Sequence, residues 1–173
     1  MLLLSRTRLA VLLISTALIA PVSVGAATYT NGNNSSTFDV SMKIVANCIV
    51  AANPLDFGQS QGVLTTAVNA NTTINVTCSN TTPYNVGLNA GSGAGSSGTT
   101  RFLSGTGGNS ATVAFNLFQT AGATLWGNTQ GTDTLAGTGT GNAQTLTVYG
   151  EIPVQKSPTP DNYKSTITAT IYF

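Results

Sequence analysis

Histidine is absent from this sequence of 173 residues, and charged residues of all kinds make up only 6% of it. A chain without histidine lacks the commonest general base and the commonest zinc ligand of proteins. Its five acidic residues stand singly, so the local sequence sets up no pair of carboxylates for hydrolysis. Serines are plentiful, but a serine nucleophile would have no histidine to activate it. We therefore expect no enzyme activity, no bound metal and no small-molecule cofactor.

Basic residues are also few, because lysine and arginine together number six and the formal net charge is only +1. Two of the six, Arg6 and Arg8, stand at the N-terminus ahead of a long apolar run. The rest of the chain has no basic patch for phosphates, and we expect no nucleic-acid partner. Charge this sparse gives a free protein little electrostatic solubility, which is typical of a protein that works in an assembly.

The N-terminal residues have the pattern of a secretory signal. Arg6 and Arg8 are followed by the run LAVLLISTALIA and then by small residues up to Ala26. A helix that spans a bilayer needs about 20 apolar residues, whereas this run is shorter and is broken by Pro21. We therefore predict a signal peptide over residues 1–26 and export of the remaining chain.

Cysteine occurs only twice, as Cys48 and Cys78, and both cysteines lie in the exported part. An oxidising compartment and an even count favour one disulfide between them. In the chain-entropy model, closing a loop of about 30 residues stabilises the fold by about 3.5 kcal/mol. Redox or metal chemistry is disfavoured, because both the CxxC spacing and histidine are absent.

Apolar and polar residues alternate along much of the chain, and no window shows the 3.6-residue period of a helix. Alternation of this kind predicts half-buried strands, and turn residues separate one segment from the next. The fold class that follows is an all-β antiparallel sandwich of six or seven strands. We expect strands within residues 37–45, 48–58, 71–80, 84–91, 111–120, 144–155 and 163–173.

A short turn at residues 80–83 predicts that the segments 71–80 and 84–91 form a hairpin. This pairing would place Cys78 on the inward face, opposite the strand that carries Cys48. Between residues 121 and 142 the chain is rich in glycine and threonine, so we expect surface loops and short edge strands there. Trp126, the only tryptophan, lies in this stretch and is either a surface contact or a residue that packs at a sheet edge.

Two segments show the alternation most clearly. In the first, apolar Phe38, Val40, Met42 and Ile44 alternate with Asp39, Ser41 and Lys43. In the second, Ile167, Ala169, Ile171 and Phe173 alternate with threonines and Tyr172 up to the last residue of the sequence. Chain termini usually fray, so a regular strand at the C-terminus should pair along both of its edges. Either other segments of this chain form both neighbouring strands, or one of the two neighbours is missing.

The ordered motifs FDVSMKIVANCIV, LDFG, INVTCS, PYNVGLNAG, TVYGEIP and YKSTITATIYF resemble the spore coat protein U family. This family includes subunits of archaic chaperone-usher pili of the Csu type. The resemblance implies that residues 38–173 form an incomplete immunoglobulin-like β-sandwich with six strands of its own and a seventh donated by a partner. The family often has glycine before a tyrosine and aspartate soon after it, whereas Pro160-Asp161-Asn162-Tyr163-Lys164-Ser165 stands here.

The resemblance also implies a function. The chain would be a structural subunit of a cell-surface pilus for adhesion and biofilm formation. It would pass through the periplasm and polymerise by donor-strand complementation. Its partners would be a periplasmic chaperone, an outer-membrane usher and other pilin subunits. The alternatives are an adhesive, lectin-like binding module and a structural protein of a spore coat.

Two sets of residues follow from this resemblance. The acceptor groove, where the chaperone would also pair, would lie along the C-terminal strand, at Ile167, Ala169, Ile171, Tyr172 and Phe173. The donor strand would lie in the N-terminal leader, residues 27–37, or just after it, and its candidate residues are Tyr29, Phe38, Val40, Met42 and Ile44. The segment 38–44 has the better apolar pattern, but it is also a candidate for the first strand of the domain itself.

Overall fold

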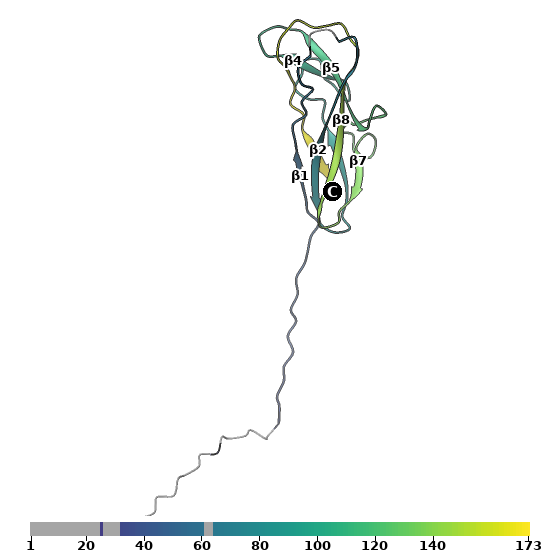
Figure 1. Ribbon diagram of the computed structural model, residues 1–173. Coiled ribbons are helices and arrows are strands. Elements are labelled where there is room, and N and C mark those ends of the chain that lie inside the picture. The colour runs from purple at the N-terminus through teal and green to yellow at the C-terminus, as the bar shows by residue number, and fades with distance from the viewer. Residues whose placement is uncertain (1–24, 26–31, 61–63) are drawn as a thin grey trace, which may run out of the picture. The chain divides into compact units, whose positions relative to one another are not determined.

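The computed structural model describes residue 25 and residues 32–60 and 64–173 (Figure 1). The predicted signal peptide, residues 1–26, lies outside the described residues except for Gly25. The chain divides into two units, Met1–Met42 and Lys43–Phe173. The described residues of the first unit form no helix or strand, and every strand reported below belongs to the second unit.

Ten strands and no helix make up the secondary structure of residues 32–60 and 64–173. They are β1 (Cys48–Ala52), β2 (Val68–Cys78), β3 (Pro83–Leu88), β4 (Arg101–Gly105), β5 (Thr112–Thr120), β6 (Thr124–Leu125), β7 (Leu135–Thr138), β8 (Ala143–Ile152), β9 (Tyr163–Lys164) and β10 (Ala169–Tyr172). Seven of them form one sheet in the order β1-β2-β8-β5-β4-β9, with β6 paired to β5. The other three form a second sheet in the order β10-β3-β7. All pairings are antiparallel, which confirms the predicted all-β class and is consistent with an incomplete immunoglobulin-like sandwich. The predicted number of six or seven strands is wrong, because short strands such as β6, β7 and β9 raise the number to ten in the described part of the chain.

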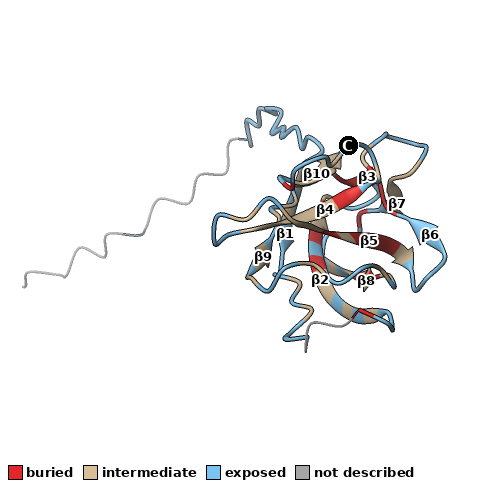
Figure 2. Ribbon diagram, turned by 90° about the horizontal axis from the view of Figure 1, so that it is seen from above, coloured by how far each residue is buried: buried red, intermediate tan, exposed pale blue. Residues whose placement is uncertain are grey.

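One hydrophobic core lies between the two sheets, and its residues are the red parts of the strands in Figure 2. On β2, alternation turns Ile74 and Val76 into the core and leaves Asn75 exposed. β8 pairs with β2 along almost its whole length and turns Val148 into the same core. The period of two that was visible in the sequence therefore sorts apolar residues to the inside and polar residues to the outside.

The predicted disulfide is confirmed. Cys48 on β1 lies directly opposite Cys78 on β2, with the two sulfur atoms 2.01 Å apart. Asn47 precedes Cys48 and Ser79 follows Cys78, and the amide of Ser79 donates to the carbonyl oxygen of Asn47 at 2.9 Å. The amide of Asn47 donates in turn to the Ser79 hydroxyl oxygen at 3.1 Å. The covalent link therefore fastens the very first residue of β1 to the neighbouring strand.

The predicted hairpin between residues 71–80 and 84–91 is wrong, because β2 and β3 belong to different sheets. The turn that follows β2 carries the chain from one sheet to the other. Thr81 adopts a positive φ of 62° in this turn. Its amide donates to the carbonyl oxygen of Gly139 at 2.8 Å, just beyond β7, which fastens the turn to the second sheet.

Three predicted strands differ from the observed ones. Residues 32–47 contain no strand, so the prediction of a strand over residues 37–45 is wrong for this chain by itself. Alternation shows that a segment fits a pleated, half-buried surface, but the segment also needs a strand edge with which to pair. β1 ends at Ala52, shortly before Pro54, which cannot donate a ladder hydrogen bond. The last predicted strand is divided, because β9 pairs with β4 in one sheet and β10 pairs with β3 in the other.

Trp126 is completely buried, with none of its surface exposed to solvent. Its indole N–H donates to the carbonyl oxygen of Val86 on β3 at 2.7 Å. The interpretation of Trp126 as a surface contact is therefore wrong, and the residue packs against β3, the central strand of the smaller sheet. The loops and short strands expected between residues 121 and 142 are confirmed, because only β6 and β7 interrupt the turns of this stretch.

Arg101 is the second large side chain in the interior, and only 1% of its surface is exposed. Its guanidinium group donates to the carbonyl oxygens of Leu88 and Asn89 at 2.8 and 3.0 Å, and to that of Trp126 at 2.7 Å. Burial lowers the pKa of Arg101 to about 10, and the nearby Asp133 opposes part of this shift. Sequence analysis assigned no role to Arg101, although it is the only arginine of the exported part.

Candidate functional site

The last strand of the chain, β10, lies at the edge of the smaller sheet. Ala169 lies opposite Leu88 of β3, and Ile171 lies opposite Val86. The residues just before β10 stay close to the same neighbour, because the amide of Asn89 donates to the carbonyl oxygen of Thr168 at 3.1 Å. Along its other edge β10 pairs with no strand in the described part of the chain.

The backbone of the C-terminal segment forms hydrogen bonds along one of its two edges. Thr166 and Thr168 turn their amides toward the β3 side, where they donate to Ser92 Oγ and Asn89 Oδ1 at 2.8 and 2.9 Å. In an extended chain, the backbone N–H and C=O groups of successive residues point toward opposite edges. The backbone groups of Ile167 therefore point toward the open edge. This edge presents unpaired N–H and C=O groups, which is the usual template for the addition of another strand.

A groove of about 1210 Å³ runs beside this open edge. One wall consists of residues 52–60, which continue from β1, and the other consists of residues 158–167 with Ala169. Core side chains from both sheets form the floor, among them Ile74, Leu88, Val113, Phe115, Leu117 and Val148. The groove therefore reaches from solvent down to the hydrophobic core, and its lining is largely apolar.

Two apolar side chains shape the wall that follows β1. Phe57 packs edge-on against Phe115 of β5, with the ring centroids 6.3 Å apart. Leu55 fits over Gly150 of β8, where a Cβ atom would come within 2.5 Å of Leu55 Cδ2. A turn closes this wall, because the amide of Gly58 donates to Asp56 Oδ1 at 2.8 Å. The lack of a side chain at Gly150 thus allows this wall to pack closely against the large sheet.

The opposite wall is anchored by Asp161, which lies in the stretch that departs from the family pattern. Its carboxylate accepts hydrogen bonds from the amide of Gly107, at 2.9 Å for Oδ2, and from the side chain of Asn109. Gly105 and Gly107 leave space for this carboxylate, since a Cβ atom on either would lie 2.7 Å from one of its oxygens. The loop after β4 therefore holds the start of the C-terminal segment in place.

The predicted acceptor residues fall into two groups. Ile167 and Ala169 line the groove, whereas Ile171, Tyr172 and Phe173 lie beyond it. Ile171 packs against the core, and the Tyr172 hydroxyl lies 3.2 Å from Asn128 Oδ1. Phe173 is largely exposed at the end of the chain. The structure thus brings the first two residues together with a set of groove residues, the walls 52–60 and 158–166, that sequence analysis did not identify.

The candidate donor residues are the most exposed large apolar side chains of the described chain. Tyr29 lies outside the described residues. The exposed fractions of the others are 85% for Phe38, 87% for Val40, 82% for Met42 and 77% for Ile44. Monomeric proteins rarely leave a run of apolar side chains this bare, and such runs mark interaction sites.

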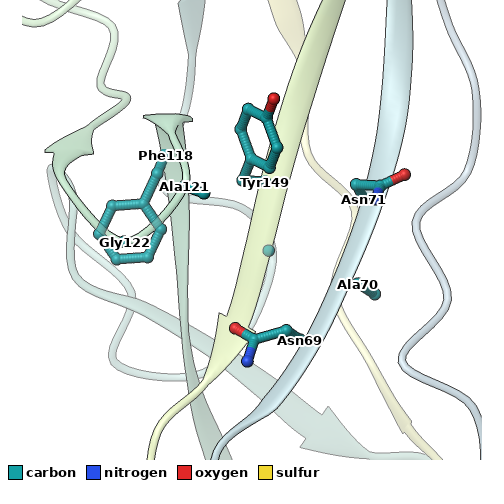
Figure 3. Close-up of a pocket in the computed structure, with 8 residues that line it drawn as sticks. Asn69, Ala70, Asn71, Phe118, Ala121, Gly122 and Tyr149 are labelled. Carbon is teal, nitrogen blue, oxygen red and sulfur yellow. The ribbon is translucent and has the colours of Figure 1, made fainter.

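The remaining surface offers less chemistry. A shallow hollow of about 170 Å³ lies on the large sheet between Asn69 of β2, Phe118 of β5 and Tyr149 of β8 (Figure 3). Residues 58–62 have the GxSxG spacing, but the described residues 58–60 lie outside any strand or helix, and the chain has no histidine to activate Ser60. No group of three or more metal-ligating side chains occurs among the described residues. In the same residues, no helix is long and apolar enough to cross a membrane.

Two solved structures contain chains that align with this one. A crystal structure of the CsuC-CsuE chaperone-tip adhesion subunit pre-assembly complex, from archaic chaperone-usher Csu pili of Acinetobacter baumannii, contains a similar chain with a TM-score of 0.54 and 20% identity. The match covers 75% of the present chain, which spans 40% of the length of that chain. The HdaB minor tip subunit of the E. coli Hda pilus aligns with a TM-score of 0.38 and 17% identity, over 72% of this chain and 79% of that one.

No curated protein matches the sequence. The pattern of the Spore Coat Protein U domain, in contrast, matches residues 34–170 and so spans both the exposed apolar segment and both walls of the groove. The chain therefore belongs to the Spore Coat Protein U domain family.

Proposed function

We infer that this protein is a structural subunit of a surface pilus, in which one copy inserts residues 38–44 as a strand into the groove of the next. The observation that carries this proposal is the apolar groove beside the open edge of the C-terminal segment. The exposed alternating segment of the same chain supplies an occupant of matching chemistry. The family match and the likeness to a chain of a Csu complex support this role.

The energetics favour a long-lived joint. Phe38, Val40, Met42 and Ile44 are exposed, and their burial in the groove would stabilise the joint by about 1.5 to 3 kcal/mol for each side chain before ordering costs. A strand in the groove would also pair with the free backbone groups of the C-terminal segment. Without a partner, an open edge beside an apolar groove promotes aggregation.

The same groove gives a role to assembly partners. A periplasmic chaperone would cover the groove after export and removal of residues 1–26, and an outer-membrane usher would then pass the subunit into the fibre on the cell surface. Residues 38–173 would form the pilin unit, of which 38–44 is the donor, and residues 27–37 would be a polar leader. This role is structural and requires no catalysis, in agreement with a chain that lacks histidine.

Two deletions of equal length test the proposal. Removal of residues 38–44 should abolish detergent-resistant fibres on the cell surface, while the subunit still accumulates in the periplasm with its chaperone. Removal of residues 31–37 should leave fibre formation intact, because that segment has no apolar alternation. Fibres of normal yield from the chain without residues 38–44 would refute the donor role of this segment.

A further inference from the structure

We propose that the hollow on the outer face of the large sheet binds one neutral sugar ring, with Tyr149 as its platform and Asn69 and Asn71 as its polar partners. The inference goes beyond the proposed function, because it gives a ligand to a face of the large sheet that takes no part in the groove. We call this place the Tyr149 hollow.

Three neighbouring strands bring the side chains of the Tyr149 hollow into one row. Tyr149 of β8 lies opposite Asn71 of β2 on one side and opposite Phe118 of β5 on the other (Figure 3). Val148, the neighbour of Tyr149 along β8, is buried in the core. Because successive side chains of a strand point to opposite faces, Tyr149 and its two partners lie on the outer face of the sheet.

The turn after β5 forms a wall of the Tyr149 hollow. The pairing of β5 with β6 shifts its register between Phe118 and Thr120, and a bulge of this kind bends a strand. Gly122 adopts a positive φ of 65° in the turn, and the amide of Ala123 closes the turn by donating to the carbonyl oxygen of Thr120 at 3.0 Å. Ala121 and Gly122 line the hollow. Only 8% of the Phe118 surface is exposed, so the hollow has an apolar side.

The polar groups of the Tyr149 hollow are available to a ligand. The side chains of Asn69, Asn71 and Tyr149 form no hydrogen bond to any described residue, and both asparagines are exposed. Asn75, on the same face of β2, in contrast accepts a hydrogen bond from the Thr145 hydroxyl at 2.9 Å. The hollow thus presents two amide groups, each able to donate and to accept, beside two aromatic rings.

A neutral pyranose matches these groups. One face of such a ring carries C–H groups that pack on an aromatic ring, and its rim carries hydroxyl groups that bind amides. The volume of about 170 Å³ fits a single ring, since drug-sized ligands occupy about 300 Å³ or more. Among the described residues, no charged side chain lines the hollow, and Glu151 lies beside it, opposite Asn69. That carboxylate can accept a hydroxyl group and repels an acidic sugar.

Nuclear magnetic resonance titrations of the purified full-length chain test this assignment. The probes are the methyl glycosides of glucose, galactose and mannose, with methyl glucuronide as the acidic probe. We expect a neutral glycoside to shift the side-chain amide signals of Asn69 and Asn71, and the glucuronide to bind more weakly.

Four variants locate the site. Tyr149→Ala should weaken binding at least ~10-fold, whereas Tyr149→Phe, which keeps the ring, should weaken it less than about 3-fold. Asn71→Ala should weaken binding ~3- to 10-fold through the loss of one hydrogen-bonding group. Asn75→Ala, at an asparagine on the same face of β2 but outside the hollow, should leave the affinity unchanged.

Three results would overturn the proposal. They are the absence of any shift with the neutral glycosides, tighter binding of the glucuronide, and equal losses from Asn71→Ala and Asn75→Ala. Thermal melts check that Tyr149→Ala still folds, and Asn71→Ala, at an exposed position, decides the test if it does not. None of these measurements involves fibre assembly, so the sugar site and the proposed function stand or fall separately.

Discussion

The two ends of the domain carry the same pattern and have different structures. Residues 38–44 and residues 165–173 both alternate apolar and polar side chains with a period of two. The C-terminal segment lies against β3 and packs Ile167 onto the core, whereas Phe38 and its apolar neighbours are almost fully exposed. A pattern therefore specifies which face of a strand is buried, but the partner depends on which edges the fold leaves free.

The same charged substitution in both segments should separate them most strongly. Met42→Asp should abolish fibre formation and leave the thermal unfolding of the free chain unchanged, since Met42 is 82% exposed there. Ile167→Asp should lower the free energy of unfolding by more than about 3 kcal/mol, because it places a charge against the core. Circular dichroism melts and detergent-resistant fibre yields measure the two effects. Equal destabilisation by both changes would contradict the comparison.

Substitution of Trp126, which packs against the strand that pairs with β10, should give the next largest loss of stability. Trp126→Ala removes a buried indole and its hydrogen bond to Val86 on β3, the strand that pairs with β10, and should cost about 3–5 kcal/mol of stability. Trp126→Phe keeps much of the packing and should cost about half as much. Chemical denaturation measures both variants. A loss of surface adhesion by Trp126→Ala with unchanged stability would instead restore the surface-contact interpretation.

Removal of the disulfide should lower the stability of the chain at the β1-β2 pairing, just after the N-terminal segment. The double variant Cys48→Ala with Cys78→Ala should lose about 3.5 kcal/mol of stability by release of the loop in the unfolded chain. The wild-type chain under reducing conditions should unfold at the same denaturant concentration as the double variant. A double variant as stable as the oxidised wild type would show that the β1-β2 pairing needs no covalent support.

Substitution of one aspartate in each segment should give the smallest difference in stability. Asp161→Ala removes the carboxylate that holds the loop at Gly107 and should cost about 1–2 kcal/mol, with looser packing at the start of the C-terminal segment. Asp39→Ala, in the exposed segment, should change the stability of the free chain by less than about 0.5 kcal/mol. Denaturant titrations of both variants test this difference, and equal losses would refute it.

Local patterns predicted the parts of the fold that depend on local chemistry. Alternation located Ile74, Val76 and the inward face of the C-terminal strand, and export with two cysteines predicted the link between Cys48 and Cys78. The hairpin after β2 was wrong because a short turn is compatible with two strands of one sheet and with a change of sheet. The sequence distance between two strands does not reveal which edge each one joins.

Long-range packing decided what sequence analysis missed. Trp126 lies among glycines and threonines typical of a surface loop, yet its indole is buried by strands distant in the sequence. Arg101 caps carbonyl groups that become neighbours only after folding. Residues 53–58 of the groove wall were predicted to continue the strand that starts at Cys48, because nothing local distinguishes a paired extended segment from an unpaired one.

The position of the disulfide has a mechanical consequence. Cys48 is the first residue of β1, and only residues 45–47 separate it from the segment that would reach into a neighbouring subunit. A pull applied to that segment arrives at a sulfur-sulfur bond before it meets any hydrogen bond of the β1-β2 ladder beyond Asn47 and Ser79. Tension along a fibre would therefore pass straight into β2, the longest strand of the sheet, and β1 would be spared from separating from β2 one residue at a time.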